Sequence, residues 1–394
     1  MKKNLLIKTL IIIAGISFIS APAISAATAK KEEKTESQKT VIKTQKKSKS
    51  KKETPFHERK DVKKFITSLV KKDKLNKKEL LKIFKDMKPR PEVISSISKP
   101  AESKKWFQYR PIFLNKSRIK LGANYWGKHR KTLLKAEKDY GVPPEMVTAI
   151  IGVETKYGAY FGNHRVIDSL ATLGFMRKRR GKFFRSELRE FLLLAKEHDL
   201  DPLKVKGSYA GAMGKPQFIS SSYRNYAIDY DGDKKINLWD SDKDVIGSVA
   251  NYFERHKWNK GQPIAVRAKI KGKKYKKLLN NKLNTRYSLA TLKKYGVTPK
   301  NKMNSKLKAN LLELEYKKGK KEYWITFDNF YVITRYNHSH LYAMAAYQLG
   351  EKIKARRKAL DKAAAKKKNR DKQKGKKTNN TKPQAKKATG KKEL

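Results

Sequence analysis

Glu154 is the residue of this sequence whose position is most unusual for its chemistry. It follows Val147, Ile150 and Ile151 at the spacing of one helix face, so the pattern places its carboxyl group on an apolar, core-facing stripe. Burial and the negative end of the helix dipole both disfavour the charged form, so we expect a raised pKa for Glu154. A carboxylic acid that stays protonated near neutral pH can act as a general acid. The alternative is a buried glutamate neutralised by an arginine or by backbone N–H groups.

A cluster of carboxylates occupies residues 229–240, in a chain that is otherwise strongly basic. Acidic residues at positions 1, 3 and 5, an apolar residue at position 8 and an asparagine at position 9 resemble an EF-hand calcium loop. Two residues depart from that pattern, because Lys234 replaces the usual glycine and Asp240 is shorter than the usual glutamate. Asp242 and Asp244 are available as substitutes. We predict a metal site, and an acidic turn is the alternative.

Three further groups are compatible with ligand binding, and each also has a structural explanation. The small residues of 207–214, followed by Gln217, allow either a ligand or another backbone to approach closely. The run 177–180 is a basic surface patch by default and an anion clamp as the second choice. Tyrosines fill protein cores but also stack on sugar rings, and the set concerned is Tyr109, Tyr226, Tyr252, Tyr336 and Tyr342.

The helix that carries Glu154 is expected to begin at Pro143 and Pro144, because proline suits a first helical turn. Gly158 is its expected C′ residue. Apolar spacing predicts two short helices near residues 65–84, a longer one at 122–140 and a last one at 339–350. Alternating apolar residues predict strands at 264–270, 311–316 and 323–327. Helical patterns before a small group of strands predict a mainly α fold of the α+β class.

Changes in composition divide the chain into segments. We predict a signal peptide at 1–26, a disordered basic linker at 27–53, an N-terminal helical subdomain at 54–139 and a catalytic core at 140–260 with an EF-hand-like loop at 229–244. A small β-subdomain at 261–335, a C-terminal helix at 336–351 and a disordered Lys-rich tail at 352–394 follow. The start of the tail, 355–365, has the alternative of extending the last helix.

The first residues indicate export. A basic start is followed by an apolar run that ends at small residues, and the run is shorter than the roughly 20 residues of a membrane span. The chain has no cysteine, which excludes disulfides, thiolate metal sites, a cysteine nucleophile and a cysteine-linked lipid. We therefore expect a soluble mature protein after cleavage near Ala26 or Ala29.

The charge of the chain predicts polyanionic surroundings, since 97 Lys and Arg outnumber 36 Asp and Glu to give a formal net charge of +61. For an exported protein the cell wall and anionic envelope lipids are nearer polyanions than nucleic acid, and a lysine-biased proteome is the plainer explanation. The sequence contains no Walker loop, dinucleotide-binding glycine pattern, zinc signature or G-x-S-x-G elbow, so we predict no organic cofactor.

Several long motifs occur in the order found in the lytic murein transglycosylase B family, whose core is similar to goose-type lysozyme. They are YGVPPE at 140–145, IIGVET at 150–155, DSLATL at 168–173, the segment 207–218, NLWD at 237–240, IGSVANYF at 246–253 and TRYN at 334–337. The chain resembles that family from about residue 58 to 350. The resemblance implies a lysozyme-like helical core with an N-terminal helical subdomain, and an enzyme that cuts peptidoglycan glycan strands.

The resemblance also implies roles for single residues. Glu154 is the implied catalytic acid and base. The implied substrate-binding residues are Ser208, Gln217, Arg179, Arg180, Tyr252, Tyr336, Asn337, Tyr342 and Tyr109. The implied ligands of a structural Ca²⁺ are Asp229, Asp231, Asp233, the backbone carbonyl of Lys235 and Asp244, with Asp240 as the second choice for the last position.

The implied reaction uses one carboxylate where ordinary glycosidases use two. Glu154 protonates the oxygen between N-acetylmuramic acid and N-acetylglucosamine, and its anion then deprotonates the C6 hydroxyl of the muramoyl sugar, which closes a 1,6-anhydro ring. We expect a monomeric, unlipidated enzyme of the periplasm, with electrostatic contact to the anionic envelope. A non-catalytic peptidoglycan-binding protein with basic tails is the main alternative, and an exported nucleic-acid-binding protein is a third.

Overall fold

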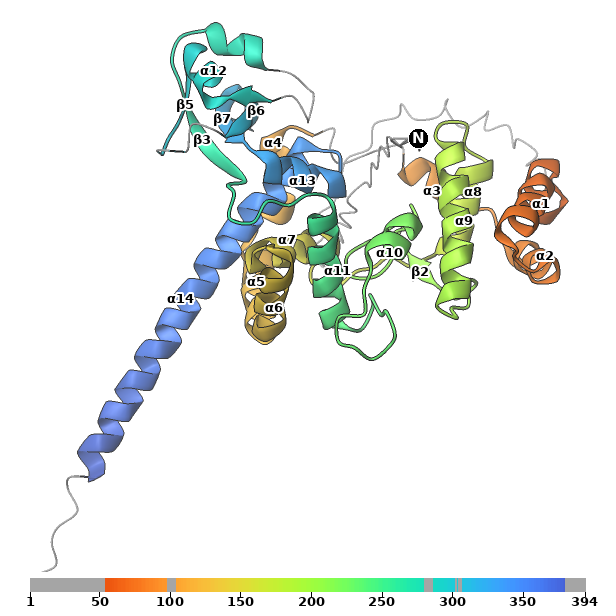
Figure 1. The fold of residues 1–394 in the computed structure, drawn as a ribbon, viewed down its shortest axis with the longest axis horizontal. Coiled ribbons are helices and arrows are strands. Elements are labelled where there is room, and N and C mark those ends of the chain that lie inside the picture. Colours follow the sequence, from red (N-terminus) through yellow and green to blue (C-terminus); the bar gives the residue numbers. More distant parts are fainter. Residues whose placement is uncertain (1–53, 98–103, 280–285, 302, 304–306, 380–394) are drawn as a thin grey trace, which may run out of the picture. The chain divides into compact units, whose positions relative to one another are not determined.

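The computed structural model describes residues 54–97, 104–279, 286–301, 303 and 307–379 (Figure 1). Contacts within the chain divide them into two compact units. The first unit contains residues 105–159 and the chain from residue 227 on, and the second contains the described residues up to 104 together with residues 160–226. The predicted signal peptide (1–26), the predicted linker (27–53) and residues 380–394 of the predicted tail lie outside the described residues.

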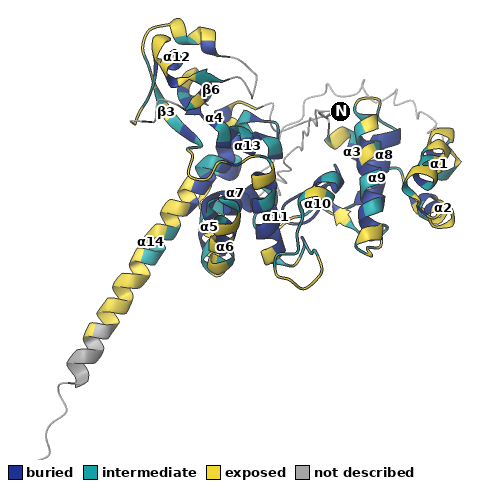
Figure 2. Ribbon diagram, in the orientation of Figure 1, coloured by how far each residue is buried: buried dark blue, intermediate teal, exposed yellow. Residues whose placement is uncertain are grey.

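Helix α7 (Pro144–Thr155) is the central element of the first unit. It begins at the predicted prolines, and 11 of its 12 residues are buried (Figure 2). The burial arises because four helices pack around it, namely α5 (Lys116–Lys128), α6 (Arg130–Tyr140), α11 (Asp242–Arg255) and α14 (His340–Asn379). Two further helices, α4 (Trp106–Phe113) and α13 (Asp328–Tyr336), pack against α14. A mainly helical core is therefore built around the motif that contains Glu154.

The strands of the first unit form one antiparallel sheet in the order β4-β6-β7-β3-β5. Leu311 pairs with Ile325, and Ala265 pairs with Thr326. The apolar face of this sheet packs against η3 (Lys274–Leu278) and α12 (Leu289–Lys294), and the three together enclose a small hydrophobic core. The strands are β3 (Ala265–Ile270), β4 (Tyr287–Ser288), β5 (Val297–Pro299), β6 (Lys308–Lys317) and β7 (Lys320–Thr326). The three predicted strands and the α+β class are confirmed.

The second unit is helical apart from a short two-stranded ladder of β1 (His164–Arg165) and β2 (Lys206–Gly207). Every residue of α8 (Val166–Phe175) is buried, and α8 packs along α9 (Gly181–Glu197). The predicted pair of short helices is confirmed as α1 (Lys60–Asp73) and α2 (Lys77–Asp86). The remaining helices are η1 (Phe56–Glu58), α3 (Pro91–Ser96) and α10 (Ser220–Tyr226).

The prediction of one helix over 122–140 is wrong, because the chain breaks at His129 between α5 and α6. The backbone of His129 is non-helical, with φ −105° and ψ 24°. Its ring lies 4.4 Å from the ring of Tyr125, and its Nε2 is 3.2 Å from a carboxylate oxygen of Asp242. These contacts with side chains of α5 and α11 stabilise the non-helical conformation of His129, and the contact with Asp242 joins residues that are far apart in the sequence.

The predicted start of a disordered tail at Lys352 is also wrong, since α14 continues to Asn379. Lys354 forms an ion pair with Glu145 of α7 at 2.6 Å, and Arg357 pairs with Asp361 one turn later at 2.8 Å. Alanines fill several other positions of this stretch and favour a helix. The helix therefore extends through and beyond residues 355–365, as the alternative allowed. Residues 362–371 of the helix are exposed (Figure 2).

Three predicted boundaries need correction. Residues 105–139 do not belong with the N-terminal helices, because α5 and α6 pack against α7 and lie in the first unit. The predicted core at 140–260 likewise contains residues 160–226, which cluster with α1, α2 and α3 in the second unit. The β-subdomain ends at Thr326, and the residues from Asp328 form α13. None of the described helices is long and apolar enough to span a membrane.

Candidate active site

Glu154 is the one residue of α7 that is not buried. The apolar side chains on the rest of the helix fix its position, and its carboxylate reaches a partly exposed surface of the first unit. Its Oε1 accepts a hydrogen bond from the hydroxyl of Tyr342 on α14, with the two oxygens 2.5 Å apart. The sequence predicted a buried, core-facing Glu154, whereas the structure leaves this residue half-buried. Partial exposure is what a group that must meet a substrate requires.

Two tyrosines, Tyr342 and Tyr336, interact with Glu154, and further tyrosines pack around them. Tyr342 is fully buried and stacks on Tyr336 at 6.5 Å between ring centres, and Tyr336 packs against Tyr252 of α11 at 4.7 Å. Burial first, and the Glu154 carboxylate second, raise the pKa of both Tyr342 and Tyr336 far above the usual value. Both hydroxyls therefore remain protonated donors at neutral pH. Tyr109 of α4 is fully buried and acts electrostatically on Tyr342.

The outer end of this tyrosine group is held by the backbone. The Tyr252 hydroxyl donates to the carbonyl of Arg335 at 2.7 Å, and the ring of Tyr252 stacks on His256 with centres 4.1 Å apart. The Nδ1 of His256 lies 2.7 Å from the Tyr252 carbonyl, so this nitrogen carries the proton. Burial lowers the pKa of His256 to about 4. Asn337, also predicted for the site, is buried at the end of α13.

Arg118 and Tyr157 shape the turn that follows Glu154. The Arg118 guanidinium donates to the carbonyl of Gly152, and the Tyr157 hydroxyl donates to the carbonyl of Arg118 at 2.9 Å. Burial lowers the pKa of Arg118, while the charges of Tyr157 and Glu154 act to raise it. A half-buried guanidinium therefore acts electrostatically on the Glu154 carboxylate. No local pattern indicated this role, because Arg118 stands in a basic helix among similar residues.

The prediction that Gly158 ends α7 is wrong, since Lys156 is already the left-handed C-cap with φ 51°. Tyr157 and Gly158 continue with φ 62° and 89°. A Cβ at Gly152 would lie 2.6 Å from the Cζ of Tyr157, so the tyrosine ring packs directly on the α7 backbone. We attribute the early end of the helix to this packing and to the hydrogen bond of Tyr157.

Ser208 and Gln217 lie in the second unit, in a loop that folds back on itself. The Ser208 Oγ accepts from the N–H of Ala212 at 3.0 Å, and Gln217 takes a left-handed φ of 50°. The Gln217 amide nitrogen donates to the carbonyls of Phe161 and Gly214 at 3.1 and 3.0 Å. Both side chains are buried and fixed by backbone groups. The small residues serve tight packing, because a Cβ at Gly162 would lie 2.7 Å from the Cα of Ser208.

Arg179 and Arg180 precede α9 in the same unit. Arg180 is its N-cap residue with a left-handed φ of 65°, and its guanidinium lies 4.4 Å from the ring centre of Phe183. Burial, followed by the charges of Arg177 and Arg179, lowers the pKa of Arg180. Arg179 is exposed. The run 177–180 is therefore a cluster of like charges, which is compatible with a basic surface patch and with the predicted anion clamp.

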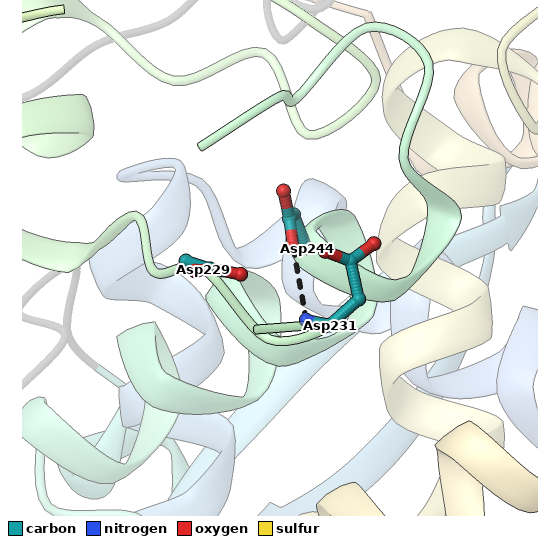
Figure 3. A group of neighbouring side chains, drawn as sticks. All are labelled: Asp229, Asp231 and Asp244. Atoms are coloured by element: carbon teal, nitrogen blue, oxygen red, sulfur yellow. Dashed lines mark hydrogen bonds between the residues drawn. The ribbon is translucent and has the colours of Figure 1, made fainter. Parts of the chain in front are cut away.

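The acidic loop brings together three of the predicted metal ligands. Carboxylate oxygens of Asp229, Asp231 and Asp244 lie within 4.8 Å of one another (Figure 3). Asp244 is buried, and its carboxylate accepts the backbone N–H groups of Tyr230 and Asn237 at 2.8 and 2.9 Å. Oxygen donors of this kind suit a hard cation such as Ca²⁺. The geometry favours Asp244 over Asp240 as the carboxylate that follows the tryptophan.

The other predicted ligands are placed less directly. Asp233 is outside the group of three, and its carboxylate accepts the N–H of Lys235 at 2.8 Å. Asp240 accepts from the side chain of Asn237 at 3.4 Å. Lys234 adopts a φ of 69°, the left-handed conformation that glycine usually supplies at this loop position. The lysine departure therefore leaves the loop geometry intact.

Comparison with known proteins decides the family. Residues 57–351 match the transglycosylase SLT domain family. The chain belongs to this family. It is 41% identical over 303 residues to the membrane-bound lytic murein transglycosylase B of Escherichia coli K12, covering 74% of this chain and 82% of the relative. This transglycosylase therefore acts on peptidoglycan as a lytic transglycosylase, and the non-catalytic alternative is not favoured.

Solved structures agree with this assignment. The soluble lytic transglycosylase SltB1 from Pseudomonas aeruginosa is 44% identical with a TM-score of 0.71, covering 74% of this chain and 98% of that one. The Escherichia coli lytic transglycosylase Slt35, in complex with calcium, is 41% identical with a TM-score of 0.69, covering 75% of this chain and 93% of that one. The fold class predicted from the sequence is confirmed.

Proposed function

We propose that this transglycosylase cleaves the β-1,4 bond between N-acetylmuramic acid and N-acetylglucosamine with Glu154 as its acid and base. The observation that carries the proposal is the position of this carboxylate. Glu154 is the one partly exposed residue of a buried helix, and Tyr342 fixes its Oε1 by a hydrogen bond. A rigid carboxyl group held at a surface by a hydroxyl donor can deliver a proton in a defined direction.

In the first step the Glu154 carboxyl group gives its proton to the glycosidic oxygen, and the bond from that oxygen to C1 of the muramoyl sugar breaks. Because Oε1 accepts the Tyr342 hydroxyl, the transferred proton is carried on Oε2. The N-acetyl group of the same sugar supports the positive charge that develops at C1. The hydroxyl of Tyr342 and the charge of Arg118 stabilise the carboxylate that remains.

In the second step the Glu154 carboxylate removes the proton from the C6 hydroxyl of the muramoyl sugar. The C6 oxygen then bonds to C1, which closes the 1,6-anhydro ring and regenerates the protonated glutamate. The product contains no atom from water. Both reacting groups belong to one sugar, so holding it in place supplies most of the entropic advantage.

The second acid of α7 does not support a two-carboxylate mechanism. Glu145 precedes Glu154 by nine residues, or about 14 Å along the helix, which exceeds the roughly 5–9.5 Å that separate glycosidase carboxyl pairs. Its carboxylate is also engaged by the Nζ of Lys354 at 2.6 Å. The helix that carries the acid therefore favours ring closure by a single carboxylate.

The substitution Glu154→Gln tests the role of this group. It keeps the shape and an acceptor for Tyr342 but removes the transferable proton, so release of anhydromuropeptides from purified sacculi should fall below detection. Glu254→Gln removes an exposed carboxylate of α11 and is the matched control, which should retain the wild-type rate. A Glu154→Gln enzyme with most of its lytic activity would refute the assignment.

Residues of the second unit complete the proposal. Ser208 and Gln217, held by backbone groups of their own loop, orient the sugar and its acetamido group. Arg179 and Arg180 meet the carboxylates of the peptide stem. On the first unit Tyr252, Tyr336, Asn337 and Tyr109 line or support the sugar-binding surface. Alanine at Gln217 should raise KM and lower kcat, which steady-state kinetics on isolated glycan strands measures.

A structural Ca²⁺ in the acidic loop is the second part of the proposal. Asp229, Asp231 and Asp244 converge, and their oxygens supply the donor type that Ca²⁺ prefers. Binding of an ion to the folded chain alone stabilises it by about 2.7 kcal/mol at a concentration of 100 times Kd. Calcium should therefore raise the melting temperature measured by calorimetry, and an identical curve in chelator and in calcium would count against the site.

Export to the periplasm and attachment to anionic envelope polymers complete the proposal. From residue 352 to 371 helix α14 carries ten Lys or Arg and two Asp, and residues 362–371 are exposed. We expect a monomer that adheres to the wall electrostatically. A chain truncated after Asp361 should pellet less with sacculi at low salt than the full chain does, and both should be released as salt rises. Equal pelleting of the two chains would contradict a role for the helix.

A further inference from the structure

The second unit contains a cavity of about 630 Å³ whose lining is strongly cationic. It lies between η1, the end of α8 and the start of α9. Its apolar part comes from Phe56 and Phe175, which are nearly buried. None of its lining residues is acidic, and five are basic, namely Arg59, Arg177, Lys178, Lys182 and Arg185.

Two of the five basic residues have a structural role. Arg59 donates to the carbonyl of Phe175 at 3.0 Å and pairs with Asp61 at 2.9 Å, and Arg185 donates to the carbonyl of Gly174. Both carbonyls belong to the last turn of α8, where a helix leaves its acceptors without partners. These two arginines therefore cap α8 whether or not the cavity holds a ligand.

The other three basic residues have no comparable explanation. Among the described residues, no carboxylate forms an ion pair with Arg177, Lys178 or Lys182. The guanidinium of Arg177 is half-buried and donates to the carbonyl of Arg179 at 3.3 Å. Burial and the charge of Arg179 both lower the pKa of Arg177. The charge of Arg177 is therefore disfavoured where it stands, and an anion in the cavity would offset this effect.

The start of α9 adds to the positive potential. Gly181 and Lys182 of its first turn line the cavity, the turn contains no acidic residue, and the side chain of the N-cap residue Arg180 does not cap the helix. A Cβ at Gly181 would lie 3.0 Å from the carbonyl oxygen of Gly174, so glycine lets the two helix ends meet. The cavity thus combines free cationic side chains with the positive end of a long helix.

We propose that this cavity binds a small multivalent oxyanion, a ligand with two or more phosphate or carboxylate groups, through Arg177, Lys178 and Lys182. Carboxylates of a peptide stem and phosphates of an envelope polymer share this chemistry. The site needs no contribution from Glu154 and goes beyond the cleavage of glycan strands. Phe56 and Phe175 give the ligand an apolar floor, while the side chains at the rim supply the charge.

The test is calorimetric titration of the full-length protein at physiological salt, with inorganic pyrophosphate in one arm and a free tetrapeptide stem in the other. The variant R177Q/K178Q/K182Q removes the three unpaired charges and leaves the two arginines that cap α8. The control K63Q/K64Q/K71Q removes the same charge from exposed positions of α1 in the same unit. Equal net charge in the two variants separates a built site from general attraction to a basic protein.

We expect at least one probe to bind the wild type, with affinity reduced at least tenfold in the cavity variant and less than twofold in the control. The probe that binds more tightly identifies the source of the natural ligand. The single charge reversal Lys182→Glu, at an exposed side chain, should reduce binding similarly and guards against misfolding of the triple variant. Absence of binding by both probes, or equal losses in the two triple variants, would overturn the proposal.

Discussion

The hydroxyl of Tyr342 offers the most informative perturbation of the active site. Replacing Tyr342 with phenylalanine removes the donor to Glu154 Oε1 and leaves the ring in its stack with Tyr336. A hydrogen bond to a charged group contributes about 1.5–3 kcal/mol. If the bond is made fully to the carboxylate formed after proton transfer, its loss lowers kcat by about 10- to 150-fold.

The exposure of Glu154 narrows this range. Its carboxylate is half-buried, so water can partly replace the lost hydroxyl, and we expect a reduction near the lower end, about 10- to 30-fold. Because the bond stabilises the reacting group and not the bound sugar, KM should change little. The initial rate of muropeptide release from purified sacculi, measured over a range of substrate concentrations, gives both constants.

A matched control is available in the β-sheet. The hydroxyl of Tyr275 lies 2.8 Å from that of Tyr323 in the β-subdomain, so Tyr275→Phe removes one part-buried hydroxyl contact without touching Glu154. It should keep wild-type kcat. The reasoning fails if folded Tyr342→Phe retains kcat within twofold of wild type, or if the control loses as much.

Three further predictions concern other parts of the first unit. Asp244→Ala leaves backbone N–H groups without their acceptor and should cost about 2–4 kcal/mol and abolish the calcium dependence of the melting temperature, which calorimetry in calcium and in chelator measures. The pKa of His256 is lowered to about 4 in the folded chain, against 6.5 in the unfolded chain, so the unfolded chain binds a proton first as the pH falls. The stabilisation from neutral His256 is therefore fully present above pH 6.5, and the free energy of unfolding falls by up to about 3 kcal/mol toward pH 4. His256→Asn keeps a donor to Tyr252 and should flatten that slope in thermal denaturation, and an unchanged slope would contradict the account. Gly152→Ala should displace the Tyr157 ring and lower activity at least tenfold with modest loss of stability, whereas wild-type activity would show that the turn tolerates the shift.

Helix periodicity located the helix that carries Glu154 but not the end of this helix. The spacing from Val147 to Glu154 predicted the element and the face on which the carboxylate lies, because both depend on residues within two turns. The left-handed Lys156 depends on where the ring of Tyr157 packs, and that contact reaches α5. The end of α7 is therefore set by tertiary packing, and no pattern in the neighbouring sequence predicts it.

The break at His129 and the length of α14 show the same limit. His129 contacts Asp242, and Lys354 contacts Glu145, so partners far apart in sequence decide both outcomes. The strands, in contrast, followed from alternation within each segment. The sheet has a face that packs on a local core, which leaves a pattern of period two in the sequence.

The active site was predicted in unequal parts. Glu154 stood out by itself, since a carboxylate on an apolar stripe conflicts with its surroundings. Tyr342 and Tyr336 are not unusual in this way, because a tyrosine on a helix is usually a core residue. Only the resemblance to a family assigned them to the site. Arg118 was missed altogether. Its relation to Glu154 exists only after α5 packs on α7.

The central claim is that Glu154 alone performs both proton transfers and that water takes no part. Digestion of sacculi in isotopically labelled water, followed by mass spectrometry of the products, tests it most directly. The account predicts muramoyl ends that lack one water relative to hydrolysed ends and carry no labelled oxygen, and their disappearance with Glu154→Gln. Reducing ends that contain the label would show hydrolysis and contradict it.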